Sequence, residues 1–302
     1  MVARGLRSAR AFAPGHVTGL FRPDVRHRDP RGRGSVGAGI VLELGAWADA
    51  RFVPGPRSRI RVVGPEPGRW PISLDVARRM APLEPGTLEV RLSHELPVGQ
   101  GFGMSAAGAL ATALSVGALS GRPRARAVEV AHLADLFGGG GLGGVAAILG
   151  GGLEIRTRAG VPPFGEVHHQ SLRGPLLVGV VGRPIPSPSI LRSPRAIARI
   201  VRAARGWEQL TEHPSSERFF ELSERFTDRV GLASPEVART VRLLRERGAW
   251  ASQAMFGQSF FARPRNGRAR RECLDWLLDQ EIRAVEIRPA VRGAWVESGR
   301  RR

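Results

Sequence analysis

A glycine-rich segment leads directly into a run of small apolar residues in the first half of the chain. Residues 97–105 read Pro-Val-Gly-Gln-Gly-Phe-Gly-Met-Ser, and residues 106–114 read Ala-Ala-Gly-Ala-Leu-Ala-Thr-Ala-Leu. The second stretch is small and apolar on every side, which is typical of a buried helix whose neighbours must approach closely. The pattern therefore predicts a tight loop joined to the N-terminus of a buried helix.

Such a loop is suited to binding phosphate. Closely spaced glycines let several backbone N–H groups converge on one point, and the helix N-terminus adds about half a positive charge there. Ser105 stands at the mouth of the loop, where its hydroxyl can bind a phosphate or Mg²⁺. The alternative is an ordinary strand-to-helix turn with Ser105 as the N-cap, and the glycine spacing alone does not separate the two interpretations.

Lysine is absent from the chain, which excludes several classes of protein. All 46 basic residues among the 302 are arginine. Schiff-base chemistry, biotinyl or lipoyl carriage and a GxxxxGK[ST] nucleotide loop each need a lysine ammonium, as does the protein-kinase site with its strand lysine. A phosphate site made from glycine backbone has no such requirement.

The formal net charge of +19 would attract polyanions. We interpret it instead as a result of biased codon usage and of attraction for small anions, because tyrosine is absent too and Asn266 is the single asparagine. Aromatic residues make up only 6% of the chain and form no RNA-binding run, so we expect no nucleic acid partner. The arginines that could grip a phosphodiester backbone, or merely cover a solvated face, are Arg192, Arg195, Arg199, Arg202 and Arg205 in one stripe and Arg263, Arg265, Arg268, Arg270 and Arg271 in a second cluster.

Cysteine content and hydropathy limit the kinds of protein that the chain can be. The single cysteine, Cys273, excludes an intrachain disulfide, and its apolar neighbours predict a packed side chain. No uncharged run of about twenty apolar residues occurs, so we expect a soluble, cytoplasmic protein without a membrane partner.

Hydrophobic periodicity predicts an α+β chain. In the first half, residues 9–13, 40–44 and 87–92 read as strands, with a break at 14–16 after the first, and residues 124–137 read as a helix. In the second half we expect strands at 176–181, 254–256 and 284–287 and helices at 194–205, 216–231, 234–247 and 268–279. A turn-rich stretch at 160–165 marks the boundary of two predicted domains, 1–163 and 164–302.

Three segments, in this order, resemble the three motifs of the GHMP small-molecule kinases. They are Ala-Pro-Gly-His-Val-Thr-Gly at 13–19, the glycine-rich segment continued to residue 108, and Ala-Met-Phe-Gly-Gln-Ser-Phe-Phe at 254–261. Within that superfamily the motifs are most similar to those of archaeal pantoate kinases. The resemblance implies a two-domain α+β fold, a β-rich N-terminal domain that carries the phosphate loop, ATP and Mg²⁺ as cofactors, pantoate as substrate and a homodimer.

The resemblance also implies roles for individual residues. The ATP phosphates would be bound by Pro97, Gly99, Gly101, Phe102, Gly103, Met104, Ser105 and Ala106. Ser105 and Asp135 would be catalytic and would hold Mg²⁺, with Asp135 at a position where the family usually has glutamate. The substrate pantoate would be bound by His16, His132, Arg156, Ser187 and Gly257.

The residues themselves leave other interpretations open. Asp135 can also cap the glycine cluster at 138–144 or pair with an arginine, and His132 can be a core histidine with satisfied hydrogen bonds. Arg156 is one of 46 arginines, so without the resemblance it carries little functional signal.

Gly144 departs from the family pattern. The family's loop reads Gly-Leu-Gly-Asp-Val, whereas residues 141–145 here read Gly-Leu-Gly-Gly-Val, so the aspartate expected to act as base is missing. We predict an ATP-dependent pantoate kinase whose catalysis is weakened or rerouted, since phosphoryl transfer depends mainly on positioning and charge neutralisation. The alternatives are another GHMP kinase, such as a mevalonate- or homoserine-kinase-like enzyme, and a non-catalytic basic protein that associates with nucleic acid.

Overall fold

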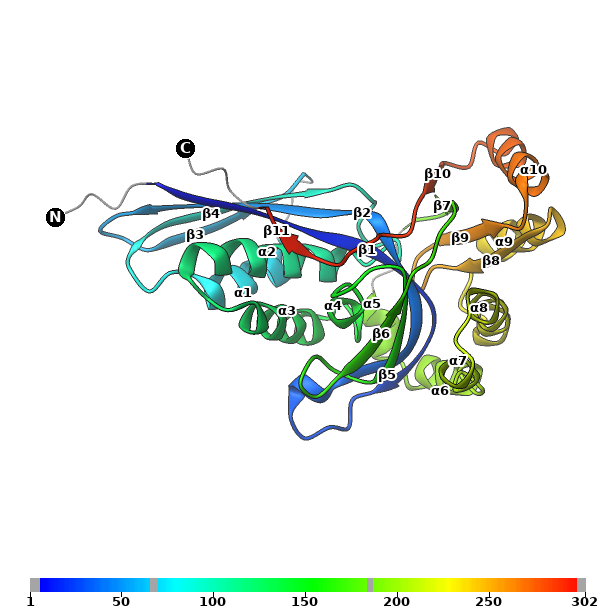
Figure 1. Cartoon of the computed structure of the whole chain (residues 1–302), viewed down its shortest axis with the longest axis horizontal. Helices are drawn as coiled ribbons and strands as arrows, with labels where there is room; N and C mark the ends of the chain where they lie inside the picture. Colours follow the sequence, from blue (N-terminus) through cyan, green and yellow to red (C-terminus); the bar gives the residue numbers. More distant parts are fainter. Residues whose placement is uncertain (1–5, 66–69, 184–186, 298–302) are drawn as a thin grey trace.

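The chain folds around two β-sheets flanked by helices (Figure 1). The computed structural model describes residues 6–65, 70–183 and 187–297, with the side chains of 187 and 188 excepted. One sheet has seven strands and the other has four, and helices are interspersed with strands along the sequence. The predicted α+β class is confirmed. None of the helices in the described ranges is long and apolar enough to cross a membrane.

Two long strands form the spine of the first sheet. Strand β1 (Arg7–Asp24) pairs antiparallel with β2 (Gly34–Pro54) along nearly its whole length. The C-terminal half of β2 pairs with β4 (Gly86–His94), which pairs with β3 (Arg59–Val63), and the N-terminal half of β1 pairs with β11 (Trp295–Val296). The N-terminal half of β2 pairs with β5 (Leu153–Arg158), which in turn pairs with β6 (Glu166–Gln170). Figure 1 shows that β1 and β2 bend between these halves, which brings β5 beneath the centre of the molecule.

Helix α2 (Met104–Ser120) lies at the centre of the first layer. It contacts β1 and β2 on one side and two further helices, α1 (Pro71–Met80) and α3 (Arg124–Gly138), on the other. Its residues are therefore buried nearly all round, as the absence of a polar face predicted. The short elements η1 (Pro30–Gly32) and α4 (Gly144–Ala147) complete this layer.

The second sheet has the order β10-β7-β9-β8. Its strands are β7 (Leu176–Val180), β8 (Ala249–Gln253), β9 (Ser259–Pro264) and β10 (Ala284–Ile287). The remaining helices are α5 (Ser187–Leu191), α6 (Pro194–Ala203), α7 (Gln209–Glu212), α8 (Ser216–Val230), α9 (Pro235–Glu246) and α10 (Gly267–Asp279). Helix α8 packs on both β1 and β8 and so joins the two sheets. Cys273 is buried in the small core beneath this sheet, as predicted.

Two predictions of secondary structure are wrong in detail, and several elements, among them β3, β5 and β6, were not predicted. Strand β1 does not break at 14–16; it continues with a register shift between Pro14 and Gly15, because Gly45 opposite has no side chain and lets Pro14 approach. The strand expected at 254–256 ends at Gln253 instead. Helix α1 was not predicted.

The predicted division into domains 1–163 and 164–302 stays a prediction. The second sheet begins at β7, whereas β6 and the C-terminal β11 both pair within the first sheet. The division between the two sheets therefore does not follow a single point in the sequence.

Candidate functional site

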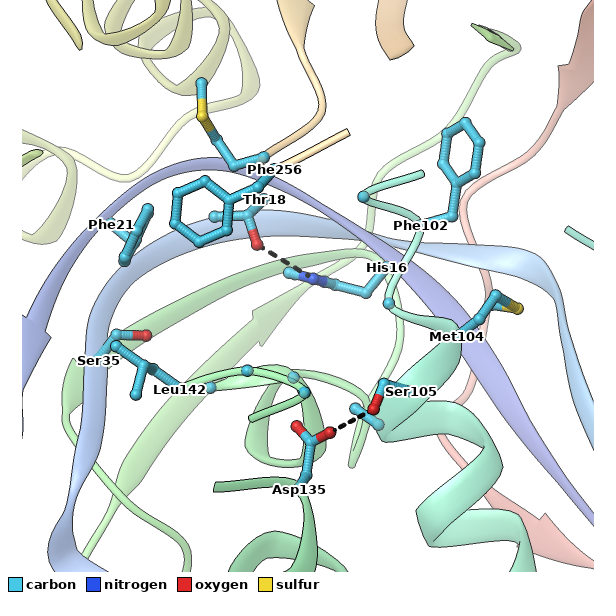
Figure 2. Close-up of a pocket in the computed structure, with 18 of the residues that line it drawn as sticks. His16, Thr18, Phe21, Ser35, Phe102, Met104, Ser105, Asp135, Leu142 and Phe256 are labelled. Atoms are coloured by element: carbon cyan, nitrogen blue, oxygen red, sulfur yellow. Dashed lines mark hydrogen bonds between the residues drawn. The ribbon is translucent and has the colours of Figure 1, made fainter. Parts of the chain in front are cut away.

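The glycine-rich loop forms a turn whose amides converge at the N-terminus of α2. Gly99, Gly101 and Gly103 adopt φ values of +75°, +77° and +70°, which only glycine adopts without strain. Gly103 is the N-cap of α2 and no side chain caps the helix. The interpretation of Ser105 as an ordinary N-cap is therefore wrong, and the first amides of the helix face the cavity shown in Figure 2.

Ser105 and Asp135 form a polar pair at this end of the cavity. The Ser105 hydroxyl donates to Oδ1 of Asp135 across 2.7 Å. The backbone oxygen of Asp135, not its carboxylate, accepts from the amides of Gly139 and Gly140 at the glycine cluster, and no ion pair joins Asp135 to an arginine among the described residues. A side chain at Gly140 would overlap both partners, so glycine there leaves the pair accessible. Burial raises the pKa of Asp135 to about 6, and the hydrogen bond from Ser105 opposes that rise only in part.

The pair suits Mg²⁺ better than it suits a metal held by protein alone. No group of three or more histidine, cysteine, aspartate or glutamate side chains that could hold a metal exists among the residues placed in the structure. Mg²⁺ usually takes one or two protein oxygens and completes its shell with phosphates and water. The hydroxyl of Ser105 and the buried carboxylate of Asp135 are such oxygens, and the desolvated carboxylate gains by pairing with a cation.

A second polar cluster consists of His16 and Arg156, which line the same cavity, and of Glu154, which binds both. His16 comes from β1, and the other two side chains come from β5. Nε2 of His16 lies 2.8 Å from Oε1 of Glu154, and Nη1 of Arg156 donates to the same oxygen. All three side chains are at most 3% exposed, so this is a fully buried charged cluster. Sequence analysis missed Glu154.

The geometry of the sheet brings the cluster together. Glu154 lies opposite Gly39 in the β2–β5 register, and a Cβ at Gly39 would overlap the His16 ring. Glycine in the middle strand therefore lets the histidine of β1 reach across to the carboxylate of β5. The available signal was an acidic residue two positions before a predicted ligand on the same strand, since Glu154 and Arg156 have one residue between them.

Charge within the cluster is mutually compensated. Burial alone raises the pKa of Glu154, but Arg156 and His16 more than offset it and hold the pKa below the ordinary value. Burial lowers the pKa of His16, and the hydrogen bond that His16 donates to Glu154 opposes this shift. Glu154 is thus an anion, Arg156 a cation and His16 a neutral imidazole at neutral pH.

Aromatic side chains close the far wall of the cavity. The rings of Phe21 and Phe256 meet edge to face with centroids 5.4 Å apart. Figure 2 shows both rings on the side opposite Ser105 and Asp135, with His16 and Thr18 between. The cavity is therefore polar at its base and apolar at one wall, as small-molecule sites generally are.

Most of the predicted ligands line this one cavity. They are His16, Gly99, Gly101, Phe102, Gly103, Met104, Ser105, Ala106, Asp135 and Arg156. Residues that line it and were not predicted include Thr18, Phe21, Ser35, Leu191, Met255, Phe256 and the glycines at 140 and 141.

Three predicted ligands do not line the cavity, and the side chain of a fourth lies outside the described part of the chain. Pro97 is exposed at the start of the glycine loop. His132 is buried and faces the backbone of Pro30 and Arg33, and its Nε2 has no hydrogen-bond partner among the described residues. Gly257 lies against the backbone of Gln100, where a side chain would overlap it. Ser187 begins α5, whose Leu191 reaches the cavity, but the side chain of Ser187 lies outside the described part of the chain.

Gly257 and its neighbours hold the glycine loop in place. The side chain of Gln100 donates to the backbone oxygen of Gly182 and accepts from the backbone amide of Gln258. The hydroxyl of Ser259 donates to the backbone oxygen of Gln100. The loop is thus held by the start of β9 and by residues beside the second sheet, since Ser259 begins β9, Gln258 precedes it and Gly182 follows β7.

Gly144 stands at the start of α4 beside the phosphate end. A Cβ at this position would lie 2.7 Å from the methyl group of Ala106, which is closer than real Cβ contacts. The place that an aspartate would occupy is therefore partly filled by the neighbouring helix.

The arginine stripe lies on the outer face of α6. Arg195, Arg199 and Arg202 are exposed there, while Ala196 and Ile200 are buried on the opposite face. In the second cluster, Arg268 pairs with a glutamate on its own helix and Arg265 stacks over Trp250. The exposure agrees with a solvated helix face and adds no observation that favours nucleic acid.

Comparison with known proteins gives one consistent result. The family model for the GHMP kinases N terminal domain matches residues 72–152. A pantoate kinase from Thermococcus kodakarensis is 32% identical over 298 residues, which cover 95% of this chain and 99% of the relative. A pantoate kinase from Methanospirillum hungatei is 31% identical and covers 85% of this chain and 88% of the relative.

A solved structure agrees with these relatives. It is described as a phosphotransferase related to the CoA biosynthesis pathway, and it superposes with a TM-score of 0.87 at 30% identity. The match covers 98% of this chain and 99% of the other. The two proteins therefore share their fold over nearly the whole chain.

Proposed function

Because the chain belongs to the pantoate kinase family of the GHMP kinases, we propose that it transfers the γ-phosphoryl group of ATP to the primary hydroxyl of pantoate, which gives 4-phosphopantoate for coenzyme A biosynthesis. The observation that carries this proposal is the placement of an amide-lined phosphate loop and a buried guanidinium in one cavity. The loop suits the polyphosphate of ATP, and the guanidinium suits the carboxylate of pantoate.

At the phosphate end, the chain contributes fixed dipoles. The amides that follow Gly103 and the N-terminus of α2 face the cavity without a side-chain cap. They would hold the phosphates without lysine and without reorganisation during the reaction, which is the main catalytic contribution in phosphoryl transfer. The contacts of Gln100 with Gly182 and Gln258, which lie beside the second sheet, hold the loop in this conformation.

Ser105 and Asp135 would hold Mg²⁺ beside the phosphates, as the donor set described above allows. When bound, the ion neutralises charge that develops on the phosphate oxygens. Before it binds, Ser105 keeps Asp135 oriented through the hydrogen bond between them.

At the acceptor end, Arg156 would bind the substrate carboxylate. Its guanidinium is fixed by Glu154 and also donates through Nε to the backbone oxygen of Ser35. An arginine held in this way loses little side-chain entropy when it binds a ligand. His16 and Thr18 line the same part of the cavity and would contact the hydroxyl end of the substrate.

Three finer points belong to the same proposal. The missing carboxylate at Gly144 predicts slower or rerouted proton transfer rather than the loss of binding. A second copy of the chain as partner and a cytoplasmic location remain predictions, the latter in keeping with ATP as substrate. His132 would support η1 and Gly257 would support the glycine loop, since neither residue lines the cavity.

An ATP-consumption assay with several acceptors tests the proposal. The purified chain is mixed with Mg²⁺ and ATP and with pantoate, mevalonate or homoserine, and ADP formation is followed together with the phosphorylated product. We expect turnover with pantoate above the rate without acceptor. Preference for mevalonate or homoserine would establish another GHMP kinase, and ADP formation with none of the three would contradict a kinase function. Arg156→Gln with Arg158→Gln as its exposed control on the same strand then tests the carboxylate contact.

A further inference from the structure

His16 is a buried imidazole with one nitrogen turned toward the acceptor end of the cavity. Its Nε2 is bound to Glu154, and its Nδ1 lies 3.5 Å from the hydroxyl of Thr18, which also lines the cavity. Figure 2 shows the ring directed into the space between Thr18 and the pair of Ser105 and Asp135. The backbone of His16 is fixed as well, because its amide donates to the backbone oxygen of Phe102 in the glycine loop.

The neighbours of His16 determine which ring nitrogen carries the proton. Glu154 is a carboxylate, and Nε2 of His16 can bond to it only by donating a proton. A neutral ring then has its lone pair on Nδ1, the atom nearer Thr18 and the cavity. The contact with Thr18 is long, so Nδ1 is free to accept a proton from a ligand hydroxyl.

The charged groups around the ring support this state. Glu154 and Arg156 face it from β5, and His169 acts on it more weakly from β6, where it is exposed. Gly39 of β2 and the glycine loop contribute no charge. A proton gained at Nδ1 is stabilised by the anion of Glu154, as a buried carboxylate stabilises an imidazolium in hydrolase triads, and is opposed more weakly by the cation of Arg156.

Resting on the proposed function, we propose that His16, oriented by Glu154, takes the proton of the acceptor hydroxyl in place of the carboxylate that Gly144 lacks. The hydroxyl oxygen forms a bond to the γ-phosphorus of ATP, and the bond between that phosphorus and the bridging oxygen breaks, leaving its electron pair on ADP. The hydroxyl proton passes to Nδ1 of His16 and is released to solvent after the product leaves. Glu154 is the positioning residue.

The crowding at Gly144 supports the relocation of the base. The methyl of Ala106 lies 2.7 Å from the Cβ position of that residue, so a side chain there would require α2 or α4 to shift. His16 already lines the cavity from β1. The proton acceptor can therefore come from the sheet rather than from the loop.

The test is a single-turnover measurement of ADP and product formation by wild type and His16→Gln across pH. Single turnover is used because product release often limits kcat. Glutamine can still donate to Glu154 but offers no base, so we expect the rate to fall about 10²–10⁴-fold with nucleotide affinity unchanged. Mg²⁺ and ATP are kept saturating, so that the bound cation holds Asp135 as a carboxylate. The wild-type rate should then fall as the pH drops below the usual histidine range, and the variant should lose this dependence.

Three further variants keep the assignment open to contradiction. His16→Ala should recover rate when imidazole is added, and Glu154→Gln should reduce the rate while retaining part of the pH dependence. His169→Gln, the exposed histidine near the same carboxylate, is the matched control and should behave as wild type. If the rate of His16→Gln still falls at low pH, the titrating group would be Asp135, and the assignment of His16 as the base would be overturned.

The same experiment separates this proposal from the proposed function. Wild-type turnover of pantoate with an equally fast His16→Gln variant would overturn the role of His16 and leave the kinase function standing. An absence of ADP formation with pantoate, mevalonate and homoserine alike would overturn both. Loss of folding in His16→Gln is read from its thermal unfolding, and rescue of His16→Ala by imidazole then decides the matter.

Discussion

The two ends of the cavity are built from different materials. At the phosphate end, the groups that face the ligand are backbone amides of one continuous loop and the start of α2. At the acceptor end, they are the side chains of His16 and Arg156, which come from two strands that are not adjacent in the sheet and are joined by the buried carboxylate of Glu154. The first end depends on local backbone conformation, whereas the second depends on strand register and on compensated charge. Substitutions should therefore act by different routes at the two ends.

The largest effect is expected at the phosphate end, for Asp135→Asn. Removal of the carboxylate should lower turnover about 10³-fold or more, because charge neutralisation at the phosphates is lost. The rate is measured as ATP and Mg²⁺ are each varied, and the rate of the variant should depend less on the Mg²⁺ concentration than the rate of wild type does. Asp135→Glu, which restores the residue usual in the family, is the control and should keep much of the activity.

The substitution Asp135→Asn should also increase the stability of the ligand-free protein. The pKa of Asp135 in the folded chain, about 6, exceeds its ordinary value of 3.8, so its contribution to stability is complete below pH 3.8 and is lost as the pH rises through 6. At pH 7–8, Asp135→Asn should therefore increase the free energy of unfolding by about 3 kcal/mol. Urea unfolding at pH 4 and pH 8 measures this, and an equal change at both values would contradict it.

The second effect is expected at the acceptor end, for Arg156→Gln. This change leaves the buried Glu154 carboxylate without its cation, which typically destabilises a protein by about 3–5 kcal/mol. It should also lower kcat/KM for pantoate about 10²-fold while ATP affinity changes little. Arg158→Gln, exposed on the same strand, should change neither quantity, and an equal loss in both variants would remove the assignment.

The contrast between the ends also explains what the sequence could predict. The loop at 97–105 lies in one contiguous stretch, so glycine spacing and the buried helix that follows identified it directly. Glu154 and His16 are 138 positions apart and meet only because Gly39 leaves space between their strands. No local pattern encodes that register, and only the resemblance pointed to His16 and Arg156.

His132 shows the limit of carrying roles over by position. It lies three residues before Asp135 on α3, a spacing that places both side chains on neighbouring parts of the helix surface. Asp135 reaches the cavity near the end of the helix, whereas His132 meets the backbone of η1. The fold around 30–33 decides this, and it could not be predicted from the helix alone.

A smaller effect is expected for Gly101→Ala in the loop. A methyl group there would lie 2.5 Å from the backbone oxygen of Ala254, and the residue has a φ of +77°. A strained position of this kind costs about 1–3 kcal/mol, so the KM for ATP should rise about 10-fold or more. The KM for pantoate should stay within about 3-fold, since the acceptor end is unchanged. Gly267→Ala, where no atom is near the added methyl, is the control.

The smallest effect is expected for Gly144→Asp, which tests whether the two ends share the work of proton transfer. If His16 accepts the proton, adding the family's aspartate should bring no gain in turnover, and contact with Ala106 at 2.7 Å should destabilise the start of α4. The double variant Gly144→Asp with Ala106→Gly removes that contact and restores the space. Single-turnover rates of both, beside Ala106→Gly alone, measure the outcome. A large gain in the double variant, together with tolerance of His16→Gln in that background, would show that the aspartate position still leads to the acceptor hydroxyl. An unchanged rate would place proton transfer on the sheet side of the cavity, away from the loop that binds the phosphates.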